Sequence, residues 1–175
     1  MLGLLIEART ANVKKTGSST INAHGHEQGV TTPTITQARP SDLQAILDLL
    51  ERSQLPRIGL EPHLPTALVA REDGGIVGSA VLEVYGRAAL LRSVAVAPER
   101  QGKGLGQALT TAALELARRR GVTTVYLLTE TAARFFPKFG FHAIDRADVD
   151  RAVLRSTEFT TACPASALVM ATTLA

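Results

Sequence analysis

A glycine-rich turn between an apolar strand and a long amphipathic helix is the feature that most constrains this chain. The apolar strand ends at residues 94–97, and a helical apolar period begins at Leu105. The turn between them carries Gln101, Gly102, Lys103, Gly104 and Gly106. Glycines lack Cβ atoms, so neighbouring backbone N–H groups can converge, and a helix N-terminus adds partial positive charge. The sequence therefore predicts a cradle for a pyrophosphate group.

Two common phosphate-binding motifs do not match this turn. A Walker A loop needs Ser or Thr after Gly-Lys, whereas Lys103 is followed by Gly104. A Rossmann fingerprint needs Gly-x-Gly-x-x-Gly, whereas the glycines here alternate and Gln107 follows the last of them. The cradle therefore belongs to another class of fold.

Hydrophobic periodicity from residue 34 onwards predicts one α+β domain. Strands are expected at residues 35–38, 67–71, 76–85, 88–97, 123–129, 141–144 and 167–173. Helices are expected from residue 40 with Ser41 as N-cap, from Leu105 to a stop at Gly121, and at residues 131–139. Residues 54–66 contain prolines and a glycine and are expected to form a loop. A helix joins strands 88–97 and 123–129, so those two should run parallel.

Residues 1–33 differ from the rest of the chain. They are rich in Thr, Ser, Gly, Asn and His, with no sustained hydrophobic period. The apolar stretch at residues 1–6 is short for a signal peptide, and basic residues follow it rather than precede it. We expect a flexible N-terminal tail ahead of one domain at residues 34–175.

Composition excludes several classes of function. A net charge of +3 over 175 residues, with no basic patch interleaved with aromatics, argues against nucleic-acid binding. No apolar run approaches the roughly 20 residues of a membrane span, so no membrane partner is expected. The four histidines are scattered, and we expect no metal site. The single cysteine, Cys163, favours a reducing, cytoplasmic location.

The sequence at residues 90–109 resembles motif A of the GNAT superfamily, the acyl-CoA-dependent N-acyltransferases. The family pattern is Gln/Arg-x-x-Gly-x-Gly/Ala after a strand rich in Val and Ile, and the resemblance extends over about residues 35–175. It implies the GNAT fold: a mixed, mostly antiparallel sheet with flanking helices, in which strands 88–97 and 123–129 are parallel and splay apart. It also implies an N-acetyltransferase that uses acetyl-CoA as co-substrate and needs no metal.

The resemblance assigns parts of CoA to named residues. The pyrophosphate is expected on backbone amides of Gln101, Gly102, Lys103, Gly104, Leu105, Gly106 and Gln107. The pantetheine arm is expected to pair with the strand edge at Val94, Ala95 and Val96, like an added strand. The N–H of Val94 is expected to polarise the thioester carbonyl, which makes Val94 a catalytic candidate.

A second segment resembles the family's Asn-x-x-Ala-x-x-Leu/Phe-Tyr-x-x-x-Gly-Phe pattern, with two departures. Thr129 replaces the Asn, and its hydroxyl is expected to reach a pantetheine amide. Phe136 replaces the Tyr that many members use as general acid, and Phe cannot donate a proton. Water or another group must then protonate the thiolate, or it leaves unprotonated. Residues 127–136 also resemble N-acetylglutamate synthases, but Thr131 stands where those have Arg.

Pleat parity predicts the acceptor site. If residues 86–87 form a two-residue turn, Glu83 pairs with Leu90 and Val81 pairs with Arg92. Parity then places four side chains on one face: Leu90, Arg92, Val94 and Val96. We expect Glu83 to relay the amine's proton through water and Arg92 to bind an acceptor carboxylate bidentately. The alternative is a cross-strand salt bridge between them with no catalytic role.

Residues 156–167 resemble the Ser-x-x-Phe…Cys-Pro-x-Ser-Ala segment of N-acetyltransferases from arsenic-resistance operons. That likeness implies an amino-acid-like acceptor, such as an organoarsenical or a phosphinothricin-type compound. Cys163 is expected to line the acceptor pocket, together with Glu130; the alternative for Cys163 is a packed small residue.

The leading hypothesis is thus an N-acetyltransferase that acts on a small amine. We expect it to be cytoplasmic, and a homodimer is one possible oligomeric state. Two alternatives stay open. One is acetylation of protein N-termini or lysines. The other is a CoA-binding regulatory module without catalysis, which Phe136 favours.

Overall fold

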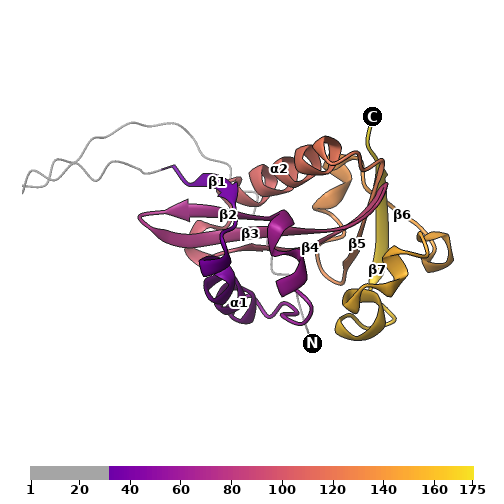
Figure 1. Ribbon diagram of the computed structural model, residues 1–175, viewed down its shortest axis with the longest axis horizontal. Helices are drawn as coiled ribbons and strands as arrows, with labels where there is room; N and C mark the ends of the chain where they lie inside the picture. The colour runs from indigo at the N-terminus through magenta and orange to yellow at the C-terminus, as the bar shows by residue number, and fades with distance from the viewer. Residues whose placement is uncertain (1–31) are drawn as a thin grey trace, which may run out of the picture.

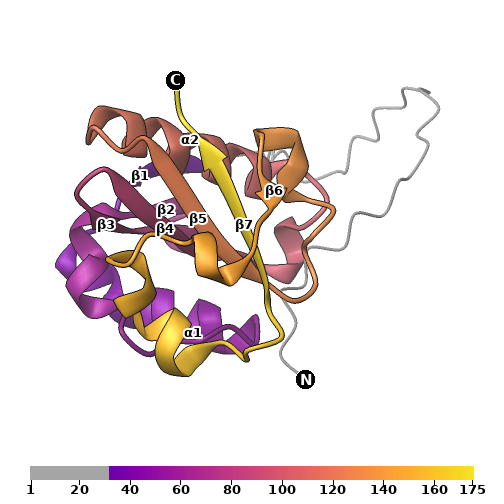
Figure 2. The ribbon, with the colours of Figure 1, turned by 90° about the vertical axis from the view of Figure 1, so that its right-hand side faces the viewer.

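The computed structural model describes residues 32–175, so the tail expected at residues 1–33 lies outside the described residues except for its last two. A seven-stranded sheet crosses this part of the chain in the order β1-β2-β3-β4-β5-β7-β6. Helix α2 covers one face of the sheet, and α1 lies on the other face with the helical turns that precede β7 (Figure 1). The view turned by 90° shows the same three layers (Figure 2).

The strands follow the hydrophobic pattern closely. The sheet consists of β1 (Thr34–Gln37), β2 (Ala67–Glu72), β3 (Gly75–Tyr85), β4 (Ala88–Val96), β5 (Thr124–Thr129), β6 (His142–Ala143) and β7 (Leu168–Thr173). The helices are α1 (Leu43–Arg52) and α2 (Leu105–Arg119). No helix of the described range is long and apolar enough to cross a membrane.

Three local expectations differ from the structure. The helix expected at residues 131–139 is reduced to the short 3-10 turn Phe136–Phe139, because Pro137 lacks the N–H that an α-helix would use there. Ser41 is not an N-cap: a 3-10 turn, Pro40–Asp42, precedes α1, and the Asp42 carboxylate accepts the Arg39 N–H at 2.6 Å. The expected loop at residues 54–66 ends in the 3-10 turn Glu61–Thr66.

The parallel step between β4 and β5 is confirmed, and it is short. Only Ala88, Ala89 and Leu90 of β4 pair with residues of β5. All other neighbours in the sheet are antiparallel. Beyond Leu90 the two central strands separate, so the sheet is splayed at its middle as the GNAT resemblance implies.

The pairing of β3 with β4 is confirmed, but the predicted common face is wrong. Glu83 pairs with Leu90 and Val81 with Arg92, as the two-residue turn requires. The register then shifts, because a β-bulge at Ser93 (φ 54°) adds one residue to β4. A bulge reverses the alternation beyond it. Val94 therefore packs in the cluster under α2, while Arg92 points to the opposite face with Leu90.

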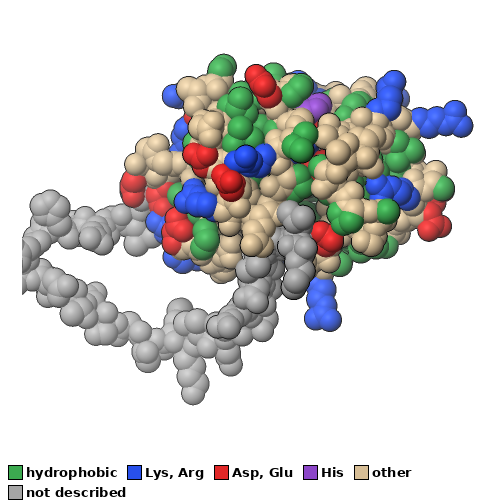
Figure 3. Space-filling view, turned by 90° about the horizontal axis from the view of Figure 1, so that it is seen from below, with side chains coloured by type: hydrophobic (Ala, Val, Ile, Leu, Met, Phe, Trp, Pro, Cys, Tyr) green, Lys and Arg blue, Asp and Glu red, His purple; other side chains and the backbone are tan. Residues whose placement is uncertain are grey.

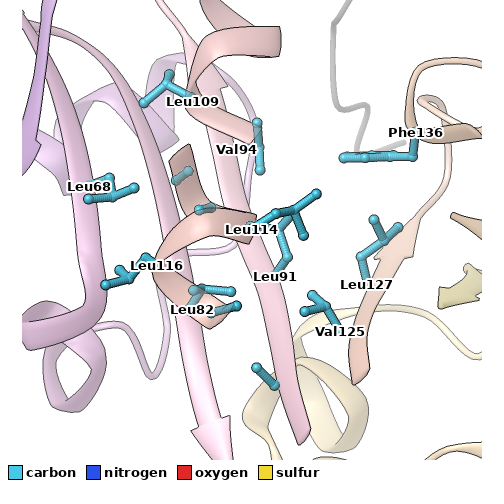
Figure 4. Packing of buried hydrophobic residues seen from close by; sticks show 14 of the residues in the cluster. Leu68, Leu82, Leu91, Val94, Leu109, Leu114, Leu116, Val125, Leu127 and Phe136 are labelled. Atoms are coloured by element: carbon cyan, nitrogen blue, oxygen red, sulfur yellow. The ribbon is translucent and has the colours of Figure 1, made fainter. Parts of the chain in front are cut away.

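The main core lies between the sheet and α2. Leu82, Leu91, Val94, Leu109 and Leu127 belong to this cluster (Figure 4). The helix lies close to β3, since a Cβ added to Gly78 would stand 2.7 Å from Leu109 Cδ1. This close packing fixes the start of α2 relative to the end of β4, and therefore fixes the glycine-rich turn.

Candidate active site

The glycine-rich turn adopts a backbone that favours glycine. Gly102 (φ 73°) and Gly104 (φ 83°) both lie in the left-handed region. No atom lies within 4 Å of a Cβ added to either residue, so the space beside the turn is open. Gly104 is also the residue that caps the start of α2. The positive φ angles therefore favour glycine here, and the open space leaves room for a ligand beside the turn.

The backbone N–H groups of this turn are available to a ligand. From Gly102 to Gln107, none donates to a backbone carbonyl of residues 32–175; the first helical bond runs from Ala108 N to Gly104 O at 3.0 Å. Open N–H groups at a helix N-terminus are suited to an anion.

Two side chains make hydrogen bonds that hold the turn. The Gln101 amide donates to the Val96 carbonyl at 3.0 Å, which ties the turn to β4. The Lys103 ammonium donates to the Glu99 carbonyl at 3.1 Å, within the same turn. These local bonds fix the conformation of the turn in which the cradle is predicted.

The separated strands expose backbone edges to each other. Val94, Ala95 and Val96 follow the last β4–β5 pair, so their edge has no partner strand on the β5 side. Thr129 ends β5 and is buried; its hydroxyl accepts the Ala132 N–H at 3.0 Å. An unpaired edge can hydrogen-bond an extended, amide-containing ligand as it would another strand.

A pocket of about 600 Å³ of empty space, its open mouth included, lies where β4 and β5 separate. Its walls are residues 54–56, 90–93, 128–130 and 162–164, with Glu158 and Ala167. Three charged side chains line it: Arg92 and Glu158, which are buried, and Glu130, which is exposed. On the molecular face seen from below, basic and acidic side chains are interspersed (Figure 3).

Arg92 joins three segments around this pocket. Its Nη1 donates to Glu83 Oε1 of β3 at 2.6 Å. Its Nη2 contacts Glu158 Oε1 at 2.6 Å and donates to the Ile58 carbonyl at 2.8 Å. The salt bridge between Arg92 and Glu83, which the sequence left as an alternative, is therefore present, and Glu158 adds a second carboxylate to it. Acceptor binding by Arg92 stays a prediction.

Glu83 lies behind Arg92 and does not line the pocket. Its Oε2 accepts the Tyr85 hydroxyl at 2.7 Å, and His63 Nε2 lies 3.7 Å away. Burial raises the pKa of Glu83, but hydrogen bonds from Ser156, Arg92 and Tyr85 outweigh it and hold the pKa below its ordinary value. Burial and the bond to Glu83 raise the pKa of Tyr85 to about 12. Glu83 is therefore a stable carboxylate at neutral pH.

Comparison with known proteins identifies the family. A family model described as "Acetyltransferase (GNAT) domain" matches residues 64–143. The "Amino-acid acetyltransferase" of Mycobacterium tuberculosis is 33% identical over 129 residues, which is 67% of this chain and 72% of that protein. The chain belongs to the GNAT acetyltransferases.

Solved structures agree with this assignment. A Mycobacterium tuberculosis protein in complex with CoA and NLQ superposes with a TM-score of 0.69 at 26% identity, covering 82% of this chain and all of that one (100%). N-acetylglutamate synthase from Neisseria gonorrhoeae, in complex with coenzyme A and N-acetyl-glutamate, superposes with a TM-score of 0.71 at 20% identity. It shows the fold alone, and the match covers 84% of this chain and 36% of that one.

Other curated relatives are longer than this chain. The "Amino-acid acetyltransferase" of Neisseria meningitidis serogroup A is 30% identical over 105 residues, which is 59% of this chain and 23% of that protein. The match thus spans about a quarter of the Neisseria protein.

Glu158 is the pocket residue of this GNAT domain that sequence reasoning missed. It opens a turn of π-helix, Glu158–Ala162, which packs beside the central strands. Burial raises the pKa of Glu158, and the charge of Arg92 offsets this only in part. One signal could have pointed to Glu158: it stands in the segment at residues 156–167, between Ser156 and Cys163.

Cys163 lines the pocket and donates its Sγ–H to Glu158 Oε2 at 2.8 Å. Burial and the neighbouring Glu158 carboxylate raise the pKa of the Cys163 thiol. A thiol held protonated is a poor nucleophile, so Cys163 acts as a hydrogen-bond donor here. Among residues 32–175, no group of three or more His, Cys, Asp or Glu side chains is arranged to hold a metal ion.

Phe136, at the position of the family's Tyr, belongs to the core. It is 2% exposed and packs edge-on against Phe135 and Phe141, with ring centroids 5.0 and 5.7 Å away. Its ring lies in the same cluster as Val94 and Leu127, which come from the two separating strands (Figure 4). Phe136 does not line the pocket, and its side chain has no proton to donate, so it cannot act as a general acid.

Proposed function

We propose that this chain transfers an acetyl group from acetyl-CoA to the amine of a small, amino-acid-like acceptor. The observation that carries the proposal is the row of open N–H groups at the start of α2 beside strands that separate around a charged pocket. Its relatives named amino-acid acetyltransferases, and the relative bound to CoA, support the choice of both substrates.

The residues present fit CoA. The N–H groups from Gly102 to Gln107 would hold the pyrophosphate, with Lys103 adding positive charge nearby. The edge of Val94, Ala95 and Val96 would hold the pantetheine amides, and Thr129 lines the pocket from the end of β5. We keep the N–H of Val94 as the group that would polarise the thioester carbonyl. Acetyl-CoA supplies the activated acyl group when bound.

The pocket presents both signs of charge, as a zwitterionic amino acid requires. Arg92 is the cation that lines it within residues 32–175, and Glu130 and Glu158 are the anions. Glu83, Glu158, Ile58 and the Ser93 hydroxyl already use all but one of the Arg92 N–H donors, which leaves one N–H of Nη1. An acceptor carboxylate would therefore meet Arg92 through one N–H, not through the bidentate contact expected from the sequence, unless it displaces Glu158.

The finer proposal is an arsenic- or phosphinothricin-type acceptor. It is supported by the segment that resembles the arsenic-operon enzymes, because Glu158, Ala162, Cys163, Pro164 and Ala167 of that segment form one wall of the pocket. A cytoplasmic location and a homodimer stay predictions.

A thiol-release screen with acetyl-CoA tests the proposal. The panel contains amino acids, their arsenic and phosphorus analogues, polyamines and peptides, and calorimetry measures acetyl-CoA affinity in parallel. Turnover confined to carboxylated small amines supports the proposal. Turnover confined to peptides would favour protein acetylation, and tight acetyl-CoA binding without any turnover would favour a regulatory module.

A further inference from the structure

We propose that Glu158 accepts the proton of the acceptor amine, and that Arg92 and Glu83 position its carboxylate. This inference rests on the proposed N-acetyltransferase function and names the group that does the proton transfer. It assigns to the segment before β7 a task that the sequence placed on β3.

The two glutamates that contact Arg92 differ in their position relative to the pocket. Both contact its guanidinium at 2.6 Å, and both are buried. Glu158 lines the pocket, whereas Glu83 lies behind Arg92 and does not. A general base must come within hydrogen-bond reach of the proton that it takes, directly or through one water. Glu158 meets this condition with fewer intervening groups.

The Glu158 carboxylate retains capacity to accept a proton. Its Oε1 is held by Arg92, and its Oε2 accepts the Cys163 thiol at 2.8 Å. Each carboxylate oxygen offers two lone-pair sites, so Oε2 can accept a second donor from the pocket side. Arg92 and Cys163 together fix the orientation of the carboxylate, which is what an effective general base needs.

Burial makes Glu158 the stronger base of the pair, although the charge of Arg92 offsets part of the effect. Arg92 of β4 faces it, Glu83 of β3 lies behind Arg92, and Cys163 follows in its own segment. Glu130, after β5, also lines the pocket. Burial raises the pKa of Glu158 while the hydrogen bonds to Glu83 lower the pKa of that residue. Two carboxylates with divergent pKa values typically take different tasks, one catalytic and one electrostatic.

The proton step balances without a further reagent. The ammonium N–H bond breaks, the proton passes to Glu158 Oε2, and the electron pair stays on nitrogen. The neutral amine then forms the N–C bond to the acyl carbon, and the C–S electron pair leaves on the CoA sulfur. The second amine proton ends on that sulfur or on water, and Glu158 returns its proton to solvent.

Kinetics of three full-length variants test this assignment on the first acceptor that the thiol-release screen identifies. Glu158→Gln should lower kcat at least a hundred-fold and remove the acidic limb of the kcat–pH profile. Glu158→Asp should restore part of kcat together with the limb. Glu83→Gln is the matched control: it loosens the same guanidinium, so kcat should fall, but the acidic limb should remain.

Titration of the carboxylates gives a readout that needs no substrate. In protein labelled with 13C at the glutamate side-chain carboxyls, the resonance lost in Glu158→Gln should titrate above the ordinary range. The resonance lost in Glu83→Gln should titrate below it. Melting temperature and acetyl-CoA affinity of each variant verify that it is folded.

The outcomes are distinct. If the acidic limb of the kcat–pH profile persists in Glu158→Gln, or is lost only in Glu83→Gln, the inference is overturned and Glu83 is the proton acceptor. A folded Glu158→Gln variant with near wild-type kcat would overturn it too. Absence of turnover with every amine would overturn the proposed function as well, and so is recognisable as a different failure.

Discussion

The substitution Gly104→Glu is expected to abolish most of the affinity for acetyl-CoA while leaving the protein folded. Gly104 caps α2 with φ 83°, and no atom lies within 4 Å of an added Cβ. A non-glycine residue in the left-handed region costs about 1–2 kcal/mol, which lowers stability without a steric clash. The added carboxylate would stand beside the open N–H groups of residues 102–107, where the pyrophosphate is expected.

The effect of the charge can be estimated from Coulomb's law. A carboxylate about 5 Å from one phosphate charge is repelled by about 1–3 kcal/mol for an effective dielectric constant between roughly 80 and 20. This corresponds to a loss of affinity of roughly 5- to 150-fold for each phosphate charge. The repulsion should shrink as salt concentration rises, because the site is open to solvent.

Matched variants separate backbone conformation from charge. Gly104→Gln has the same size without the charge, so the difference between the two variants in calorimetric affinity for acetyl-CoA measures the repulsion. Gly121 follows the other end of α2 with φ 75° and equally open surroundings. Gly121→Gln should therefore lose similar stability in urea unfolding but bind acetyl-CoA normally. Unchanged affinity in a folded Gly104→Glu variant would refute the pyrophosphate cradle.

Three further predictions follow from the contacts of the site. Arg92→Lys keeps the charge but removes the planar guanidinium fork, so the free energy of unfolding in urea should fall by about 1.5–3 kcal/mol. Arg71→Lys, at an ion pair whose arginine side chain is 24% exposed, should lower that free energy far less. Phe136→Tyr should change turnover by no more than a few-fold, because thiolate departure already proceeds without a general acid at this position; a loss of roughly a hundred-fold in a folded variant would mean that Phe136 packs the site rather than occupying a vacated acid position. The lowered pKa of Glu83 stabilises the fold at pH above its unfolded pKa, and this contribution is lost as pH falls through the folded pKa. Glu83→Gln should therefore flatten the acidic end of the stability–pH curve, and an unchanged curve would show that Glu83 contributes nothing there.

The register of the central hairpin could be predicted because a short turn sets it. Gly86 takes a positive φ of 66°, and the two-residue turn leaves a single pairing for Glu83 and Leu90. The glycine-rich turn was predictable for the same reason: a strand, a turn with a fixed backbone and a helix follow one another directly. Local constraints of this kind depend on contiguous residues, so the sequence pattern shows them directly.

The bulge at Ser93 could not be predicted from the sequence. Every residue of β4 is buried, so its two faces show no apolar–polar alternation that would reveal a change of phase. The role of Glu158 was hidden for a different reason. Its partner Arg92 lies far away along the chain, and only the folded sheet brings the two within 2.6 Å.

The bulge resolves a conflict between the core and the pocket. With regular alternation, Arg92 and Val94 would share a face, so that either the guanidinium would enter the apolar cluster under α2 or the valine would leave it. The positive φ of Ser93 costs about 1–3 kcal/mol, and two hydrogen bonds hold it: Ser79 Oγ to the Ser93 carbonyl at 2.9 Å, and Arg92 Nε to Ser93 Oγ at 3.3 Å. Bulges also bend a strand, and this one follows closely after Leu90, the last residue of β4 that pairs with β5. A single extra residue thus lets Arg92 line the pocket while Val94 stays in the core under α2, close to the place where β4 and β5 separate.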